Sequence, residues 1–241
     1  MKLHPLLAAI IALSAIVPSP AAAQPSAEAR QIDWALERGR LLFGLDRSAW
    51  VATHDLLKRM PNAEAKGVIG YVVERVERPE VFEGGARPEL TAAQARLARA
   101  FEAAHQKAAQ LPRCGSDPFN VAIVPAQSAD NPLDVYLMTP QTAAGFPLGG
   151  HHRFTLDATS REIARRSFAR SCLRMAKEPN ASGAQPVAMV VSHLLDPIPT
   201  EIHVFTALAA QVSVYVVIAR PRRLFEVNGQ GIRLVRASKQ R

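Results

Sequence analysis

The hydrophobic pattern changes its period near Cys114, and this change constrains the fold more than any other feature of the sequence. Before Cys114, apolar residues recur at helical spacing, most clearly over 91–110. After it, apolar and polar residues alternate, first as Phe119, Val121 and Ile123. A run of helices followed by a run of strands predicts an α+β fold with a largely antiparallel C-terminal β-sheet.

Two consecutive helices are predicted before the first strand. The first covers 27–43 and ends at Gly44, because glycine is favoured just beyond a helix C-terminus. The second begins at Asp46, a good N-cap residue, and ends near Met60 because Pro61 cannot continue it.

A strand over 67–76 and a further helix over 91–110 follow this helix pair. Thr91 and Gln94 have the spacing of a capping box at the start of that helix. The strands expected in the C-terminal part are 119–125, 133–139, 151–157, 163–170, 187–193, 200–207, 212–219, 222–227 and 231–236.

The first 23 residues have the three-part organisation of a secretory signal peptide. Lys2 precedes an apolar run from Leu6 to Val17, and an Ala-x-Ala cleavage site ends at Ala23. The run is shorter than the roughly 20 residues that a membrane-spanning helix needs. We therefore expect cleavage after Ala23, a periplasmic or secreted protein, and no transmembrane segment in the mature chain.

The mature chain is long enough for one sizeable core. We expect a helical and β N-terminal part over 24–112 and a β-rich part over 113–238, folded together as one unit. Its two cysteines, Cys114 and Cys172, lie in a chain bound for an oxidising compartment, which favours a disulfide bond between them. Two separate buried thiols are the alternative.

Positive charge is concentrated in the C-terminal third of the chain. Residues 160–241 contain 13 Lys or Arg against 5 Asp or Glu. A basic surface outside the cytoplasm attracts an anionic envelope component such as lipid, lipopolysaccharide or a glycan. A merely solvated face is the alternative. The candidate anion-binding residues are Arg165, Arg166, Arg170, Arg220, Arg222 and Arg223.

Nucleic acid is not an expected partner, because the few aromatic residues do not alternate with the arginines as a base-stacking surface requires.

Histidine and glutamate give one candidate metal site. His193, Glu201 and His203 would meet if residues 193 and 201 pair across a hairpin, since Glu201 and His203 share a face of the predicted strand. Either His151 or His152 would complete the site, because adjacent strand residues point to opposite faces; His152 has the parity of core positions. Two imidazoles and a carboxylate suit a divalent metal with an open position.

No recognised catalytic or cofactor motif accompanies these residues. The sequence lacks a Gly-x-Ser-x-Gly nucleophile elbow, a dinucleotide-binding Gly-x-Gly-x-x-Gly and a phosphate-binding loop. We therefore expect no cofactor and, as the leading hypothesis, a non-enzymatic binding or structural module of the cell envelope. A metal-dependent hydrolase or metal-binding protein that uses the His/Glu cluster is the alternative.

Three segments carry a resemblance to other proteins. They are Asp46–Trp50 after the helix over 27–43, His152–Asp157 with Ser171–Leu173 after it, and Pro199–Phe205. Together they resemble functionally uncharacterised exported proteins of Gram-negative bacteria. The resemblance covers most of the mature chain and implies export, with no activity attached.

Overall fold

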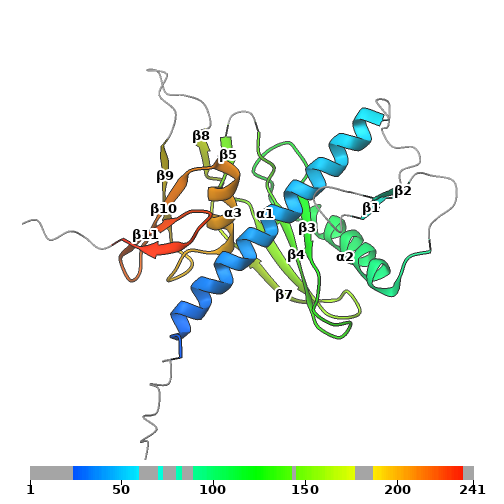
Figure 1. Ribbon diagram of the computed structural model, residues 1–241, viewed down its shortest axis with the longest axis horizontal. Coiled ribbons are helices and arrows are strands. Elements are labelled where there is room, and N and C mark those ends of the chain that lie inside the picture. Colours follow the sequence, from blue (N-terminus) through cyan, green and yellow to red (C-terminus); the bar gives the residue numbers. More distant parts are fainter. Residues whose placement is uncertain are drawn as a thin grey trace, which may run out of the picture.

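The computed structural model describes residues 24–59, 70–72, 80–82, 89–142, 145–176 and 187–235. Helix α1 (Ala27–Arg59) crosses the molecule diagonally and lies beside both of its larger sheets (Figure 1). Helices and a largely antiparallel C-terminal set of strands confirm the predicted α+β class. The predicted signal peptide, residues 1–23, lies outside the described residues.

One four-stranded sheet has the order β3-β4-β6-β7 and is antiparallel throughout. One face packs on helix α2, where Ala100 and Ala104 meet Val135, Leu137 and Phe154. The opposite face packs Tyr136 and Met138 against α1 and the segment 202–205. Thr91 caps α2 with the predicted capping box. The elements are α2 (Ala92–Ala108), β3 (Asn120–Val124), β4 (Leu133–Met138), β6 (His152–Leu156) and β7 (Glu162–Ser167).

The second four-stranded sheet has the order β12-β11-β10-β9. Strands β9 and β10 are parallel, and the other neighbours are antiparallel. Two short two-stranded ladders, β1-β2 and β5-β8, complete the described strands. The bounds are β1 (Gly70–Val72), β2 (Glu80–Phe82), β5 (Gly145–Pro147), β8 (Arg174–Ala176), β9 (Ala188–His193), β10 (Ser213–Ile218), β11 (Arg223–Val227) and β12 (Ile232–Leu234).

The predicted strand over 200–207 is wrong, because these residues form helix α3 (Glu201–Ala210). The segment between 201 and 207 is buried on every side, so its apolar residues show neither a helical nor an alternating period. A short apolar run of this kind does not distinguish a buried helix from a buried strand. Helix α3 is the crossover that parallel strands require, and it joins β9 to β10.

The predicted break between two N-terminal helices is also wrong, since α1 continues through Gly44 and Asp46 to Arg59. An interior glycine costs a helix about 1 kcal/mol relative to alanine. The flanking side chains offset this cost, because Phe43 and Leu45 pack against the core formed by Tyr136, Phe205 and their neighbours. Of the predicted strand over 67–76, only 70–72 lies within the described residues, as part of β1.

Helices α1 and α3 pack closely at Gly39. A β-carbon at this position would lie 2.5 Å from the Val204 Cβ and 2.7 Å from the Glu201 carbonyl oxygen. Only glycine therefore permits the two helices to approach this closely. This contact fixes the position of the first turn of α3, which includes His203.

Cys114 and Cys172 lie at disulfide-bonding distance, as the sequence predicts, with their Sγ atoms 2.02 Å apart. The pair joins the segment after α2 to the segment between β7 and β8. Gly150, at φ +73°, lies against it, and a β-carbon there would be 2.5 Å from the Cys114 Sγ. Within the described part of the chain, no helix is both long enough and apolar enough to span a membrane.

Candidate functional site

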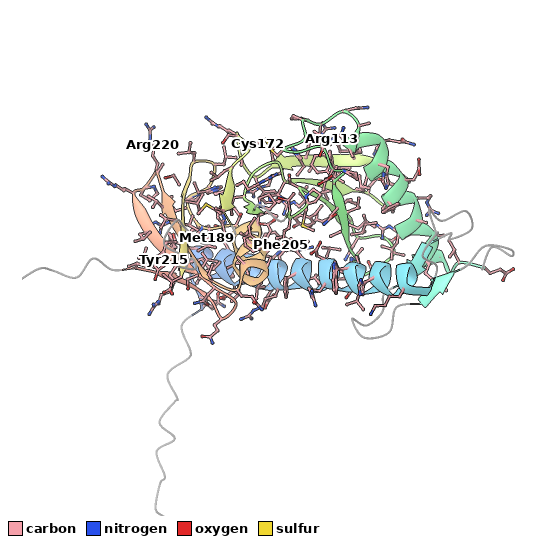
Figure 2. All side chains as sticks on the ribbon, turned by 90° about the horizontal axis from the view of Figure 1, so that it is seen from above. Arg113, Cys172, Met189, Phe205, Tyr215 and Arg220 are labelled. Atoms are coloured by element: carbon pink, nitrogen blue, oxygen red, sulfur yellow. A yellow bond between two sulfur atoms is a disulfide. The ribbon has the colours of Figure 1, made fainter. Side chains whose placement is uncertain are left out.

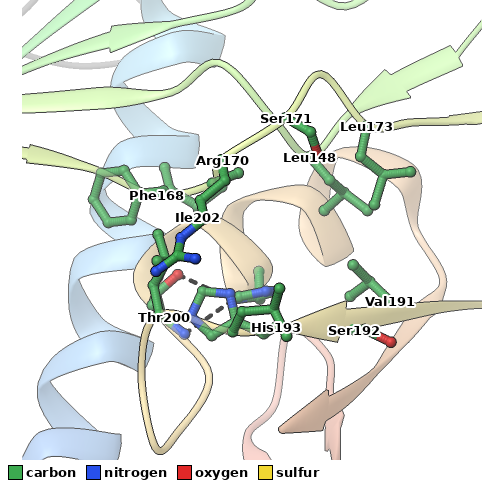
Figure 3. Close-up of a pocket in the computed structure, with 14 residues that line it drawn as sticks. Leu148, Phe168, Arg170, Ser171, Leu173, Val191, Ser192, His193, Thr200 and Ile202 are labelled. Carbon is green, nitrogen blue, oxygen red and sulfur yellow. Dashed lines mark hydrogen bonds between the residues drawn. The ribbon is translucent and has the colours of Figure 1, made fainter. Parts of the chain in front are cut away.

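A small pocket opens at the C-terminal end of β9, where the chain turns toward α3. One wall is residues 168–171 with Leu173, and the other is residues 191–195 with the first residues of α3 (Figure 3). The carboxyl end of a parallel strand is a usual ligand position in α/β structures. The pocket volume of about 80 Å³ lies well below the ~300 Å³ at which pockets enclose a whole small molecule. It therefore suits a chemical group of a few atoms.

His193 ends β9 on its buried face and is held by a carboxylate. Its Nε2 lies 2.7 Å from Asp196 Oδ2, and the same oxygen accepts a hydrogen bond from Arg166 at 2.6 Å. Burial raises the pKa of Asp196, but the His193 hydrogen bond and the Arg166 charge outweigh it and leave this pKa below its usual value. Asp196 is therefore ionised and orients the His193 ring.

His203 lies in the first turn of α3 and is 5% exposed. The Thr200 backbone N–H donates to its Nδ1 at 3.0 Å, and the Thr200 hydroxyl lies 3.0 Å from the same nitrogen (Figure 3). Burial, reinforced by the neighbouring His193, lowers the pKa of His203 to about 3. The ring is neutral at physiological pH.

Arg170 supplies the positive charge of the pocket. Its side chain extends toward Thr200 and His193 in Figure 3. Within the described ranges, no carboxylate or carbonyl binds its guanidinium. A guanidinium without an anionic partner in the described ranges, beside the rings of His193 and His203, makes the pocket attractive to an anion.

The predicted metal ligands do not all come together. His193 and His203 are neighbours, with ring centroids 4.7 Å apart. Glu201, two residues before His203 on a helix rather than a strand, points elsewhere, because residues two apart on a helix lie about 200° around its axis. Its Oε1 accepts from Tyr136 Oη at 3.0 Å and from Arg153 at 3.1 Å.

His151 is buried away from His193 and His203, and both of its ring nitrogens contact backbone groups. Its Nδ1 accepts from the Thr139 N–H at 3.3 Å, and its Nε2 lies 3.1 Å from the Pro147 carbonyl oxygen. His152 packs edge-on against Phe119. In the part of the chain that the structure describes, no group of three or more His, Cys, Asp or Glu side chains has the arrangement of a metal site.

The six candidate anion-binding arginines separate into two groups. Arg165, Arg166 and Arg223 form ion pairs with Glu162, Asp196 and Glu28 respectively. The members without a carboxylate partner among the described residues are all exposed: Arg170 lies at the pocket, and Arg220 and Arg222 lie in the β10–β11 turn.

The β10–β11 turn adjoins the pocket loop. The Ala219 N–H donates to the His193 carbonyl oxygen at 3.2 Å, and the Arg223 guanidinium donates to the Pro197 carbonyl oxygen at 2.5 Å. Figure 2 shows Arg220 at the end of the molecule formed by this sheet. The exposed arginines therefore extend the positive charge around one side of the site.

Sequence reasoning missed Asp196, Thr200 and the leucines of this pocket. Asp196 stands in an Asp-Pro-Ile-Pro segment, a pattern that favours a turn residue over a member of a carboxylate pair with Glu201. The available signal was the His193-x-x-Asp196 spacing at the end of a strand, which places the carboxylate beside the imidazole when the chain turns. The Pro199-Thr200-Glu201 sequence was also a helix N-terminus signal that the adjacent apolar run obscured.

Known proteins add no further information about this site. No protein-family model, curated protein or solved structure matches the chain. The functional argument consequently rests on the geometry of the pocket.

Proposed function

We propose that the protein is an exported binding module of the cell envelope, and that its pocket holds the anionic headgroup of an envelope amphiphile. The observation that carries the proposal is the Arg170 guanidinium, which has no carboxylate partner among the described residues, in a pocket with exposed apolar edges. The predicted signal peptide and the cysteine pair support a location outside the cytoplasm, where anionic lipids and lipopolysaccharide are available.

The rim of the pocket supports an amphiphile rather than a glycan. Leu173, Leu194 and Leu195 line the pocket and are 40%, 64% and 37% exposed. Each buried CH₂ group of an acyl chain contributes about 0.8 kcal/mol to binding. A headgroup beside Arg170 would leave its hydrocarbon against these leucines, whereas a glycan has no acyl chain to cover them.

The positive charge near the pocket also favours an anionic ligand. The Arg166–Asp196 pair is electrically neutral as a unit, so Arg170 and the exposed Arg220 and Arg222 determine the local potential. Interactions between such exposed charges and a charged surface weaken with salt, because the Debye length falls from about 10 Å at 0.1 M to about 3 Å at 1 M.

Vesicle co-sedimentation tests the proposal. Phosphatidylcholine vesicles that contain phosphatidate or phosphatidylglycerol are compared with neutral vesicles at low and high salt. We expect binding to at least one anionic vesicle, reduced about 10-fold by Arg170→Ala and by high salt. Arg161→Ala is the matched control, because Arg161 is exposed and its one ion-pair partner among the described residues is Asp157 in the β6–β7 turn. Equal binding to neutral vesicles, or an equal effect of both variants, would overturn the proposal.

A further inference from the structure

The pocket beside Arg170 has room for a headgroup but not for the hydrocarbon attached to it. Its volume is about 80 Å³, whereas pockets that enclose a whole small molecule begin at ~300 Å³. The apolar side chains at its inner end, Leu148, Val191 and Ile202, are buried in the packed cores of the protein. An acyl chain whose headgroup occupies this pocket therefore leaves it through the mouth.

The apolar surface at the mouth is open to solvent. Leu173 lies on one wall, and Leu194 and Leu195 lie on the other wall, where β9 ends. Leu194 is the most exposed of the three, at 64%. An acyl chain that lies on an open surface covers one of its sides and leaves the other in water. Hydrocarbon is thus better shielded from water in a bilayer than in a soluble complex with this protein.

The loop between β9 and α3 holds its exposed leucines in a fixed position. Asp196 accepts a hydrogen bond from Arg166 of β7. The Pro197 carbonyl oxygen accepts one from Arg223 of β11. Ile198 is buried in the core that β9 and β10 form. Because the loop is already ordered, insertion of its leucines into another apolar medium costs little conformational entropy.

The charges around this loop suit an anionic surface. Arg170 lies at the mouth of the pocket, and Arg220 and Arg222 are exposed in the adjoining β10–β11 turn (Figure 2). None of these three arginines has a carboxylate partner among the described residues. The carboxylate of the loop itself, Asp196, is neutralised by Arg166. Positive charge therefore flanks the exposed leucines.

On the basis of the proposed headgroup-binding function, we propose that the partner is the surface of an intact anionic bilayer and that the bound lipid stays in it. Leu194 and Leu195 insert beside the lipid whose headgroup occupies the pocket. The three arginines lie at the level of the surrounding headgroups. Apolar burial combined with attraction to anionic lipid is what holds a protein at a membrane interface. The protein therefore docks on a membrane and does not carry lipid through solution.

Tryptophan fluorescence tests the insertion, because brominated acyl chains quench an indole only when they contact it. We expect anionic vesicles of brominated lipid to quench Leu194→Trp more strongly than the wild-type protein, whose Trp34 belongs to α1. Val187→Trp is the matched control. Val187 is 90% exposed and precedes β9, roughly 20 Å from Leu194 at about 3.3 Å per strand residue. Quenching of Leu194→Trp no stronger than that of Val187→Trp would overturn the inference.

Aspartate at the same two positions tests the contribution to binding. Leu194→Asp removes an inserted side chain and adds a charge that anionic lipid repels, so we expect vesicle binding to weaken about 10-fold or more. Val187→Asp should bind within about twofold of the wild-type protein. Both positions are exposed, so both variants should keep the wild-type urea unfolding midpoint. Unchanged vesicle binding by Leu194→Asp would count against the insertion.

The fate of the lipid separates failure of this inference from failure of the proposed function. After the vesicles are pelleted, we expect no lipid in the supernatant with the protein. Stoichiometric lipid on the soluble protein would overturn the docking and leave the headgroup pocket standing. Self-association without lipid that Leu194→Asp abolishes would assign the leucines to a second copy of the chain and also overturn the docking. No binding to any anionic vesicle, and no lipid on the soluble protein, would overturn both proposals.

Discussion

The imidazole rings of His193 and His203 meet edge to face, 4.7 Å apart between centroids. One belongs to the end of a parallel strand and the other to the first turn of the helix that follows it. Asp196 orients the first ring, and the backbone of Thr200 orients the second. The relation places two oriented imidazole rings in one small pocket, which Arg170 also lines.

Acid should destabilise the protein through its buried histidines. An unfolded histidine has a pKa of 6.5, whereas burial lowers the pKa of His203 to about 3 and that of His151 to about 4. Between these values the unfolded chain binds more protons than the folded protein. The free energy of unfolding therefore falls as the pH decreases below 6.5, by up to about 1.4 kcal/mol per pH unit for each histidine.

Two measurements check this pH dependence. Histidine NMR titration should show no protonation of His151 or His203 above pH 5. Urea unfolding between pH 7 and pH 5 should show the slope, and His151→Gln should reduce it. His105→Gln is the control, because its ring is exposed beside Phe101. Titration of both buried rings near pH 6.5 would contradict the prediction.

Two glycines of helix α1 should respond in opposite directions to alanine. Gly39→Ala places a methyl group against Val204 and the Glu201 carbonyl, and overpacking of this kind costs about 1–3 kcal/mol. Gly44→Ala meets nothing within 4 Å, so helix propensity alone should stabilise the protein by up to about 1 kcal/mol. Urea unfolding midpoints measure both. A stabilising Gly39→Ala would show that the helices do not pack as described.

Loss of the Cys114–Cys172 link should destabilise the fold strongly. The two cysteines are 58 residues apart in the sequence, and closing a loop of this length contributes roughly 4 kcal/mol in the chain-entropy model. Thermal unfolding of the Cys114→Ser/Cys172→Ser double variant measures the loss. The mass of the denatured, unreduced wild-type protein, about two daltons below the dithiol value, reports the bond itself. An unchanged unfolding midpoint would count against a structural role.

Glu201→Gln should reduce stability without changing anion binding. The substitution removes the buried charge that balances Arg153, which we expect to cost about 1–3 kcal/mol. Binding to anionic vesicles should stay within about twofold, because Glu201 faces Tyr136 rather than the pocket. Glu226→Gln is the surface control, since Glu226 pairs with the largely exposed Arg233 and surface pairs contribute at most about 1 kcal/mol. A large loss of vesicle binding in Glu201→Gln would return this residue to the binding site.

Several features of the fold could be predicted from short stretches of the sequence. The alternation from Phe119 onward predicted β3, β4 and β6, the Thr91 capping box predicted α2, and the compartment of the cysteines predicted their pairing. Each of these signals is local, or needs only the count and location of one residue type. Arg170 was likewise named from the excess of positive charge.

Long-range packing determines that residues 201–207 form a helix rather than a strand, and it determines which side chains line the pocket. Burial on all sides removes the period that would distinguish a helix from a strand, and packing against Tyr136 and Phe205 carries α1 past Gly44. The change from strand to helix turned Glu201 away from His203 and brought Asp196 to His193 instead. Which side chains converge depends on how distant elements pack, and that information is not contained in local spacing.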